Sequence, residues 1–131
     1  MLRRHLMLLA AAAVAAVTAA CGSAQPTAVH VQTIATVSST DFRAVVGARR
    51  TGGGSAPTAR VTVTTYRKAA GHWRRLVAHR LAGTYFWHTV TGPHAVCRLE
   101  LATAKKPQVT VGLLLSPSLG CGRSQTIRLG S

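Results

Sequence analysis

An alternation of apolar and polar side chains with a period of two runs through most of residues 29–131. In segment 29–37, for example, Val, Thr and Ala side chains alternate with His, Gln and Thr, and segment 61–66 is β-branched almost throughout. A period of two places alternate side chains on opposite faces of a strand, whereas an amphipathic helix repeats its apolar side chains every 3.6 residues. β-branched side chains also pack well on a pleated surface. The pattern therefore predicts a chain built from strands.

Eight segments carry this strand pattern: 29–37, 42–49, 61–66, 73–81, 85–91, 96–101, 109–115 and 126–129. Turn-forming residues separate them, above all the Thr-Gly-Gly-Gly-Ser-Ala-Pro run at 51–57, and no helical pattern lies between them. Short antiparallel strands at this spacing are typical of all-β folds. We therefore predict an antiparallel β-sandwich or small barrel of about seven to eight short strands.

Three strand segments leave alternatives open. Segment 73–81 also fits a helical stripe, although the flanking Gly71 and Gly83 favour a strand. The apolar run 112–115 predicts a strand that is covered on both sides. In 85–88, the sequence Tyr-Phe-Trp-His predicts a core strand with Phe86 pointing inward, or else an exposed aromatic platform for a ligand.

Residues 1–20 have the pattern of a cleaved export signal. Arg3 and Arg4 precede an uncharged run of 12 apolar residues at 6–17, and small residues follow. The run is shorter than the roughly 20 apolar residues that span a bilayer, and the small residues fit a cleavage site. We therefore predict an N-terminal signal helix at 1–20, a linker at 21–28 and a β-sandwich domain at 29–131.

The sequence Thr18-Ala19-Ala20-Cys21 resembles the lipobox of bacterial lipoproteins, although Thr18 stands where a lipobox usually has Leu. The resemblance implies that the Cys21 thiol carries a diacylglyceryl group and that the chain is cut before Cys21. It also implies a lipid anchor on the extracytoplasmic side of the cell membrane. The alternative is ordinary signal cleavage after Ala20 or Ala24, which gives a secreted protein.

The cysteine count is odd, which in an exported protein requires an explanation. If Cys21 carries lipid, Cys97 and Cys121 can pair in an oxidising compartment. A metal pair and two free thiols are the alternatives. Because these two cysteines lack C-x-x-C spacing, we predict a disulfide.

Charge excludes several classes of function. The chain has 16 Lys and Arg against two acids, Asp41 and Glu100, for a net charge of +14. Cleavage after residue 20 removes Arg3 and Arg4, so 14 basic and 2 acidic residues leave +12. Two acids provide little for paired-carboxylate catalysis or an oxygen-ligand metal cage, and no G-x-S-x-G nucleophile motif occurs. We expect no enzymatic activity, no cofactor and no metal site.

The same excess of cations predicts an anionic partner, because uncompensated positive charge opposes the compact state and attracts polyanions. The densest cations are Arg67, Lys68, Arg74, Arg75 and Arg80, and we predict that they bind an anionic ligand. In an envelope protein, anionic lipids and wall polymers are the available partners. Basic residues beside Tyr66 and Trp73 resemble those of nucleic-acid binders, but without such a fold motif nucleic acid is an unlikely partner.

The leading interpretation is therefore a basic binding or structural module of the cell envelope. The alternative is a secreted protein-binding module or enzyme inhibitor that acts through the loop at 51–58 or the region around Cys121, with another envelope protein as its partner.

Overall fold

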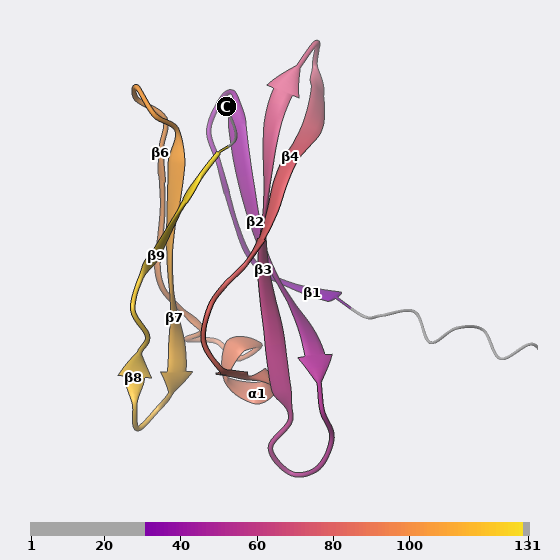
Figure 1. Cartoon of the computed structure of the whole chain (residues 1–131), viewed down its shortest axis with the longest axis vertical. Coiled ribbons are helices and arrows are strands. Elements are labelled where there is room, and N and C mark those ends of the chain that lie inside the picture. Colours follow the sequence, from indigo (N-terminus) through magenta and orange to yellow (C-terminus); the bar gives the residue numbers. More distant parts are fainter. Residues whose placement is uncertain (1–30, 130–131) are drawn as a thin grey trace, which may run out of the picture.

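The computed structural model describes residues 31–129, which form two antiparallel sheets that face each other (Figure 1). The first sheet has the order β1 (Val31–Ser38), β2 (Phe42–Thr51), β3 (Thr58–Ala69) and β4 (His72–Arg80), and β5 (Tyr85–Phe86) pairs with the start of β3. In the second sheet, β7 (Gln108–Ser116) lies between β6 (Val96–Ala102) on one side and β8 (Gly120–Cys121) and β9 (Gln125–Arg128) on the other. The single helical turn α1 (Trp87–Val90) connects the sheets.

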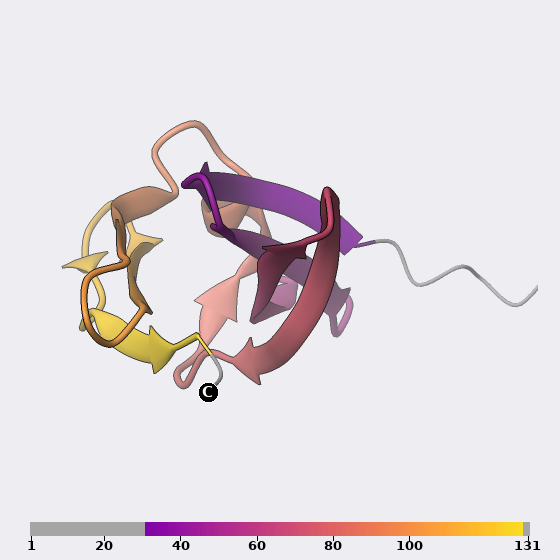
Figure 2. The same cartoon turned by 90° about the horizontal axis from the view of Figure 1, so that it is seen from above.

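The predicted sandwich is confirmed, and the two sheets do not join into a closed barrel. The view from above shows them as two curved layers (Figure 2). The predicted signal helix at 1–20, Cys21 and the linker at 21–28 lie outside the described residues. Between Val31 and Leu129, no helix is long and apolar enough to cross a membrane.

The core lies between the two sheets and consists of the inward side chains of their middle strands. These side chains are almost fully buried: Ala44, Val46 and Ala48 on β2, Val61 and Val63 on β3, and Val109, Val111 and Leu113 on β7. They occupy every second position, as the period of two requires. The residues between them consequently lie on the outer faces of the sheets.

A β-bulge changes the predicted alternation of β1. The register with β2 shifts between Thr33 and Ala35, so that Ile34 is an extra residue in β1. Val31 therefore lies on the outer face with 58% of its surface exposed, whereas Val37 packs against the core. The expectation that alternate residues of 29–37 share one face is wrong across this bulge.

The predicted strand at 85–91 is largely replaced by α1. The backbone N–H of Trp87 donates to the carbonyl of Pro57, and the backbone N–H and the hydroxyl of Thr91 both donate to the carbonyl of Trp87, which closes the turn. Tyr85 is the buried aromatic residue at 4% exposure, and Trp87 packs against the core. The prediction that Phe86 points inward as the core residue is therefore wrong, and the aromatic side chains form no exposed platform.

The two other open segments are strands. Segment 73–81 forms most of β4, which confirms the strand prediction. In β7, Gly112 is buried on the outer face, where a Cβ atom would lie 2.8 Å from the hydroxyl of Ser124 and 3.4 Å from the Cβ of Arg98. Leu114 remains only partly buried, so the predicted coverage on both sides holds for part of the run.

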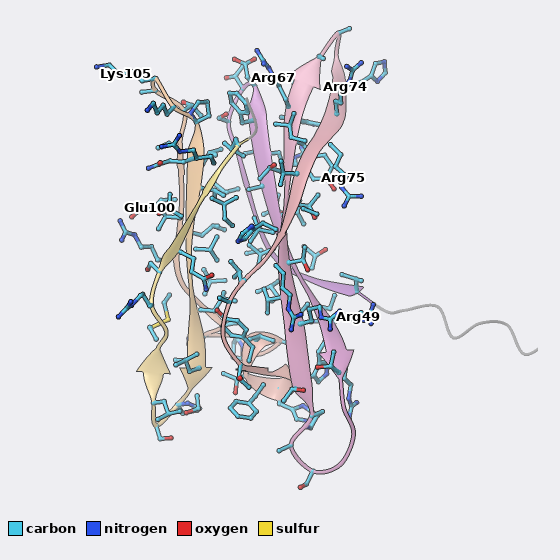
Figure 3. All side chains as sticks on the ribbon, in the orientation of Figure 1. Arg49, Arg67, Arg74, Arg75, Glu100 and Lys105 are labelled. Carbon is cyan, nitrogen blue, oxygen red and sulfur yellow. A yellow bond between two sulfur atoms is a disulfide. The ribbon has the colours of Figure 1, made fainter. Side chains whose placement is uncertain are left out.

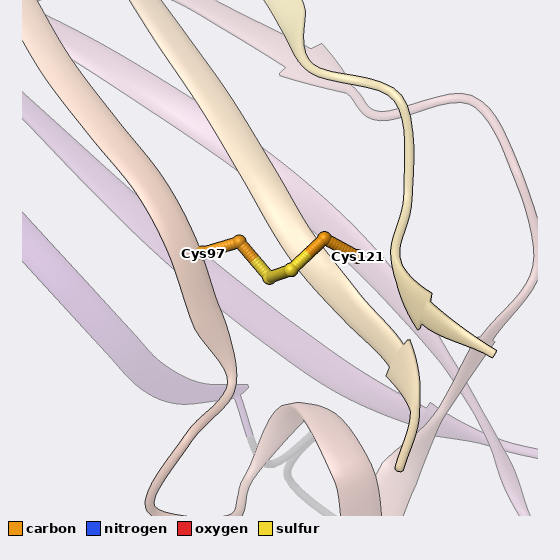
Figure 4. Close-up of a disulfide and its surroundings, with 2 residues drawn as sticks. All are labelled: Cys97 and Cys121. Atoms are coloured by element: carbon orange, nitrogen blue, oxygen red, sulfur yellow. A yellow bond between two sulfur atoms is a disulfide. The ribbon is translucent and has the colours of Figure 1, made fainter. Parts of the chain in front are cut away.

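The predicted disulfide between Cys97 and Cys121 is confirmed (Figure 4). It joins β6 to β8, the strands on either side of β7. Its Cα atoms are 6.1 Å apart, although two strand spacings amount to about 9.6 Å. A register shift between Val96 and Arg98 makes Cys97 an extra residue in β6, and the sheet must curve at this point to bring the flanking strands together.

Candidate anion-binding face

The outer face of the first sheet carries six cationic side chains, which we call the cationic face. They are Arg43 and Arg49 on β2, Arg60 and Lys68 on β3, and Arg75 and Arg80 on β4. Their neighbours along β2 and β3 form the core, and directly paired residues of an antiparallel sheet share a face. In Figure 3, Arg49 and Arg75 lie on the side of the first sheet that faces away from the second.

A second β-bulge brings the cations of β4 onto this face. Thr65 pairs with Val77 and Tyr66 pairs with Arg75, which leaves Leu76 as an extra residue. In an uninterrupted strand, Arg75 and Arg80 would lie on opposite faces because they are five residues apart. The bulge reverses the alternation, so that both residues lie on the cationic face.

A hollow of about 260 Å³, the first hollow, opens in the middle of the cationic face. Small side chains line its centre and longer ones surround them: Gly47, Thr62, Thr64 and Ala78, with Val31, Arg49, Arg60 and Arg75. The strand register explains the hollow. Across the middle of the face, Gly47 is paired with Thr62 and Thr64 is paired with Ala78, so only short side chains meet there. Long side chains on the flanking rows then leave a concave centre whose polar groups are guanidinium groups and hydroxyls.

Acidic residues are absent from the lining of this hollow. Among residues 31–129 the acids are Asp41, in the turn between β1 and β2, and Glu100, on the second sheet (Figure 3). Glu100 accepts a hydrogen bond of 2.9 Å from Arg98, and this bond lowers the pKa of the Glu100 carboxyl. It forms the one salt bridge in the described part of the chain. The described residues carry 14 basic and 2 acidic side chains, or +12, and the lining of the first hollow contributes three of these cations.

The five predicted ligand-binding cations divide between two faces. Lys68, Arg75 and Arg80 lie on the cationic face, whereas Arg67 and Arg74 are paired with each other on the opposite face of β3 and β4. Local alternation alone separates Arg67 from Lys68 and Arg74 from Arg75.

The other three members of the face, Arg43, Arg49 and Arg60, are not among the cations predicted from the sequence to bind a ligand. The sequence pattern could have placed Arg43 and Arg49 on the outer face, because both alternate with the apolar residues of 42–49 that form the core.

Two aromatic residues, Tyr66 and Trp73, lie on this face, and cations already engage Trp73. The Arg43 guanidinium carbon lies 4.3 Å from the ring centre of Trp73, and the Lys68 amine lies 5.7 Å from it. Such cation–π contacts hold these cations on the ring. Arg43 and Lys68 thus lie beside the first hollow without lining it.

A larger, mostly apolar cleft of about 560 Å³ lies beside the segment between β4 and β5. Its polar groups bond to one another: Gln125 accepts from the backbone N–H of Ala82 and donates to the carbonyl of Ala82 and the hydroxyl of Tyr85. Burial raises the pKa of Tyr85, and the bond from Gln125 opposes that rise. The cleft has one cationic side chain, Arg123. The hydrogen bonds of Gln125 hold the segment between β4 and β5 in place.

No cluster of three or more His, Cys, Asp or Glu side chains within residues 31–129 is placed to hold a metal ion. Comparison with known proteins gives no match to a family model, a curated protein or a solved structure.

Proposed function

We propose that this protein is an exported, lipid-anchored module that binds phosphate-bearing polyanions of the cell envelope through its cationic face. The observation that carries the proposal is the first hollow, where Arg49, Arg60 and Arg75 surround threonine hydroxyls without an acidic neighbour. A planar guanidinium group matches the geometry of a phosphate and forms two parallel hydrogen bonds with it. The hydroxyls of Thr62 and Thr64 supply further donors at the centre of the hollow.

The anchor and the cationic face fit together in this proposal. Val31 lies ten positions after Cys21, and a fully extended chain over ten residue steps spans at most about 34 Å. Val31 itself lines the first hollow. A lipid on Cys21 would therefore keep the hollow within reach of the anionic material at the membrane surface.

The face is tested with two triple variants that remove the same charge. Arg49→Gln with Arg60→Gln and Arg75→Gln empties the first hollow of cations, and Lys106→Gln with Arg123→Gln and Arg128→Gln removes three exposed cations elsewhere. Each cation near an anionic surface contributes about 1 kcal/mol, so the first variant should bind phosphatidylglycerol vesicles and poly(glycerol phosphate) about 100-fold more weakly. The second variant should lose less than about threefold. Binding is measured by co-sedimentation and titration calorimetry at low salt.

Melting temperatures within a few degrees of the wild type confirm that both triple variants fold. Equal losses of affinity in the two variants would show that net charge rather than this face governs binding, and would contradict the proposed site.

The anchor is tested separately in the full chain. Wild-type protein should sediment with membranes and carry a diacylglyceryl group on Cys21, because a lipid partitions its host into the bilayer. Cys21→Ser should move the protein into the soluble fraction. Mass spectrometry of the mature wild-type protein decides the question, since an unmodified Cys21 within it would exclude the lipid anchor.

A further inference from the structure

A second hollow of about 200 Å³ lies next to the first and shares a side chain with it. Its lining combines hydroxyl groups with two arginines: Thr51, Thr58, Thr84, Tyr85, Arg60, Arg80, Ala59 and Gly83. Arg60 lines both hollows. One arginine therefore borders two recessed, hydroxyl-bearing sites.

The two hollows follow one another along β3. The first takes Arg60, Thr62 and Thr64 from this strand, and the second takes Thr58, Ala59 and Arg60. The middle residues of these two sets, Thr62 and Ala59, are three residues apart along β3, or about 10 Å at the rise of a strand. Each hollow has at least two arginines, Arg60 and Arg75 in the first and Arg60 and Arg80 in the second.

We infer that the ligand is a linear polymer of polyol phosphate diesters that lies along β3 with a phosphate in each hollow and Arg60 between them. This inference rests on the proposed function and specifies its ligand. A single small anion would leave one hollow empty, whereas two phosphates of one chain can occupy both. The second phosphate of such a chain binds at a high effective concentration once the first is bound.

The shape of the face favours a thin chain over a membrane surface. Gly47, Thr62 and Thr64 lie at the centre of the first hollow, behind the longer side chains of Arg49 and Arg75. A flat layer of headgroups would meet the arginine tips first, whereas a single polymer chain can enter the hollow and reach the threonine hydroxyls.

The lining also favours a polyol phosphate over a nucleic acid. Single-stranded nucleic acids bind through aromatic side chains on which bases stack. The first hollow has no aromatic side chain, the Tyr85 of the second is 96% buried, and Trp73 is engaged by Arg43. Tyr66 lies on the same face but lines neither hollow. The two hollows therefore offer guanidinium and hydroxyl groups without a platform for bases.

The test measures affinity against chain length. Glycerol phosphate oligomers from one unit upward are titrated into the mature protein at low salt. A longer oligomer binds somewhat more tightly simply because it offers more phosphates. Once the oligomer can span both hollows, its affinity should rise more than tenfold beyond that gain, and with further length the affinity should level off. Arg60→Gln should remove this rise, because Arg60 connects the two sites. Lys68→Gln, which removes one charge from the same face outside both hollows, should retain it.

A second variant tests the hollow without any change of charge. Gly47→Val places a side chain in the first hollow, where a Cβ atom on Gly47 would lie 3.1 Å from the exposed side chain of Val31. The variant should fold, as a melting curve can show, and should also lose the rise with length.

The possible outcomes separate this inference from the proposed function. Affinity that grows only in proportion to the number of phosphates, or a rise with length that survives Gly47→Val, would overturn the inference while the proposed function stands. Tighter binding to phosphatidylglycerol vesicles, or to single-stranded DNA with the same number of phosphates, would overturn it in favour of a membrane or a nucleic acid. No binding to any of these probes at low salt would overturn the proposed function itself.

Discussion

Raising the salt concentration from about 50 mM to about 500 mM should weaken the binding of poly(glycerol phosphate) about 25-fold. Cations on a linear polyanion release its condensed counterions, and the slope of log K against log salt is about −0.7 for each phosphate neutralised on a single strand. A phosphate in each of the two hollows gives a slope of about −1.4. Titration calorimetry at five or six salt concentrations gives the slope directly.

The triple variant Arg49→Gln, Arg60→Gln, Arg75→Gln is the matched comparison for this prediction. Its slope should fall to about half of the wild-type value, since only the second hollow keeps an arginine, Arg80. Affinity that changes less than about threefold across the salt series would contradict the electrostatic mechanism. Such a result would favour the alternative of a protein-binding module, whose contacts depend only mildly on salt.

Replacing both Cys97 and Cys121 by Ala should lower the free energy of unfolding by about 3.5 kcal/mol. The disulfide closes a loop with a sequence separation of 24, and the chain-entropy model gives that value for a loop of this length. In a domain of about 100 residues, this loss corresponds to a fall in melting temperature of roughly 15 °C. Both cysteines are exposed, so their replacement creates no buried cavity that would add a second cost.

Reduction of the wild-type protein provides the control for the disulfide. A reducing agent should lower the melting temperature of the wild type to that of the Cys97→Ala, Cys121→Ala variant, and should leave the variant unchanged. Calorimetric melting curves with and without the reducing agent make the comparison. An unchanged melting temperature in the variant would show that the sheet pairing around β7 is stable without the bridge.

The strands, their turns and the disulfide could be predicted from the sequence because they depend on neighbouring residues or on the count of a rare residue. Alternation over 42–49 and 61–66 reports which side chains face the core, since each residue reverses the face of the one before it. Local alternation could not predict that α1 would replace most of the strand expected at 85–91. The turn α1 begins with a hydrogen bond from the backbone N–H of Trp87 to the carbonyl of Pro57, thirty residues earlier in the chain.

Alternation, the excess of cations and the pairing of Cys97 with Cys121 were therefore determined by the sequence itself. Only the tertiary structure decided which cations lie together. The extra residue Leu76 in β4 brings Arg75 and Arg80 to one face, and the register of β2, β3 and β4 sets Gly47 beside Thr62 to form the hollow between them. The physical reason is that one bulged residue reverses the face of every residue after it, and pairing between strands, rather than any local pattern, fixes where the bulge falls.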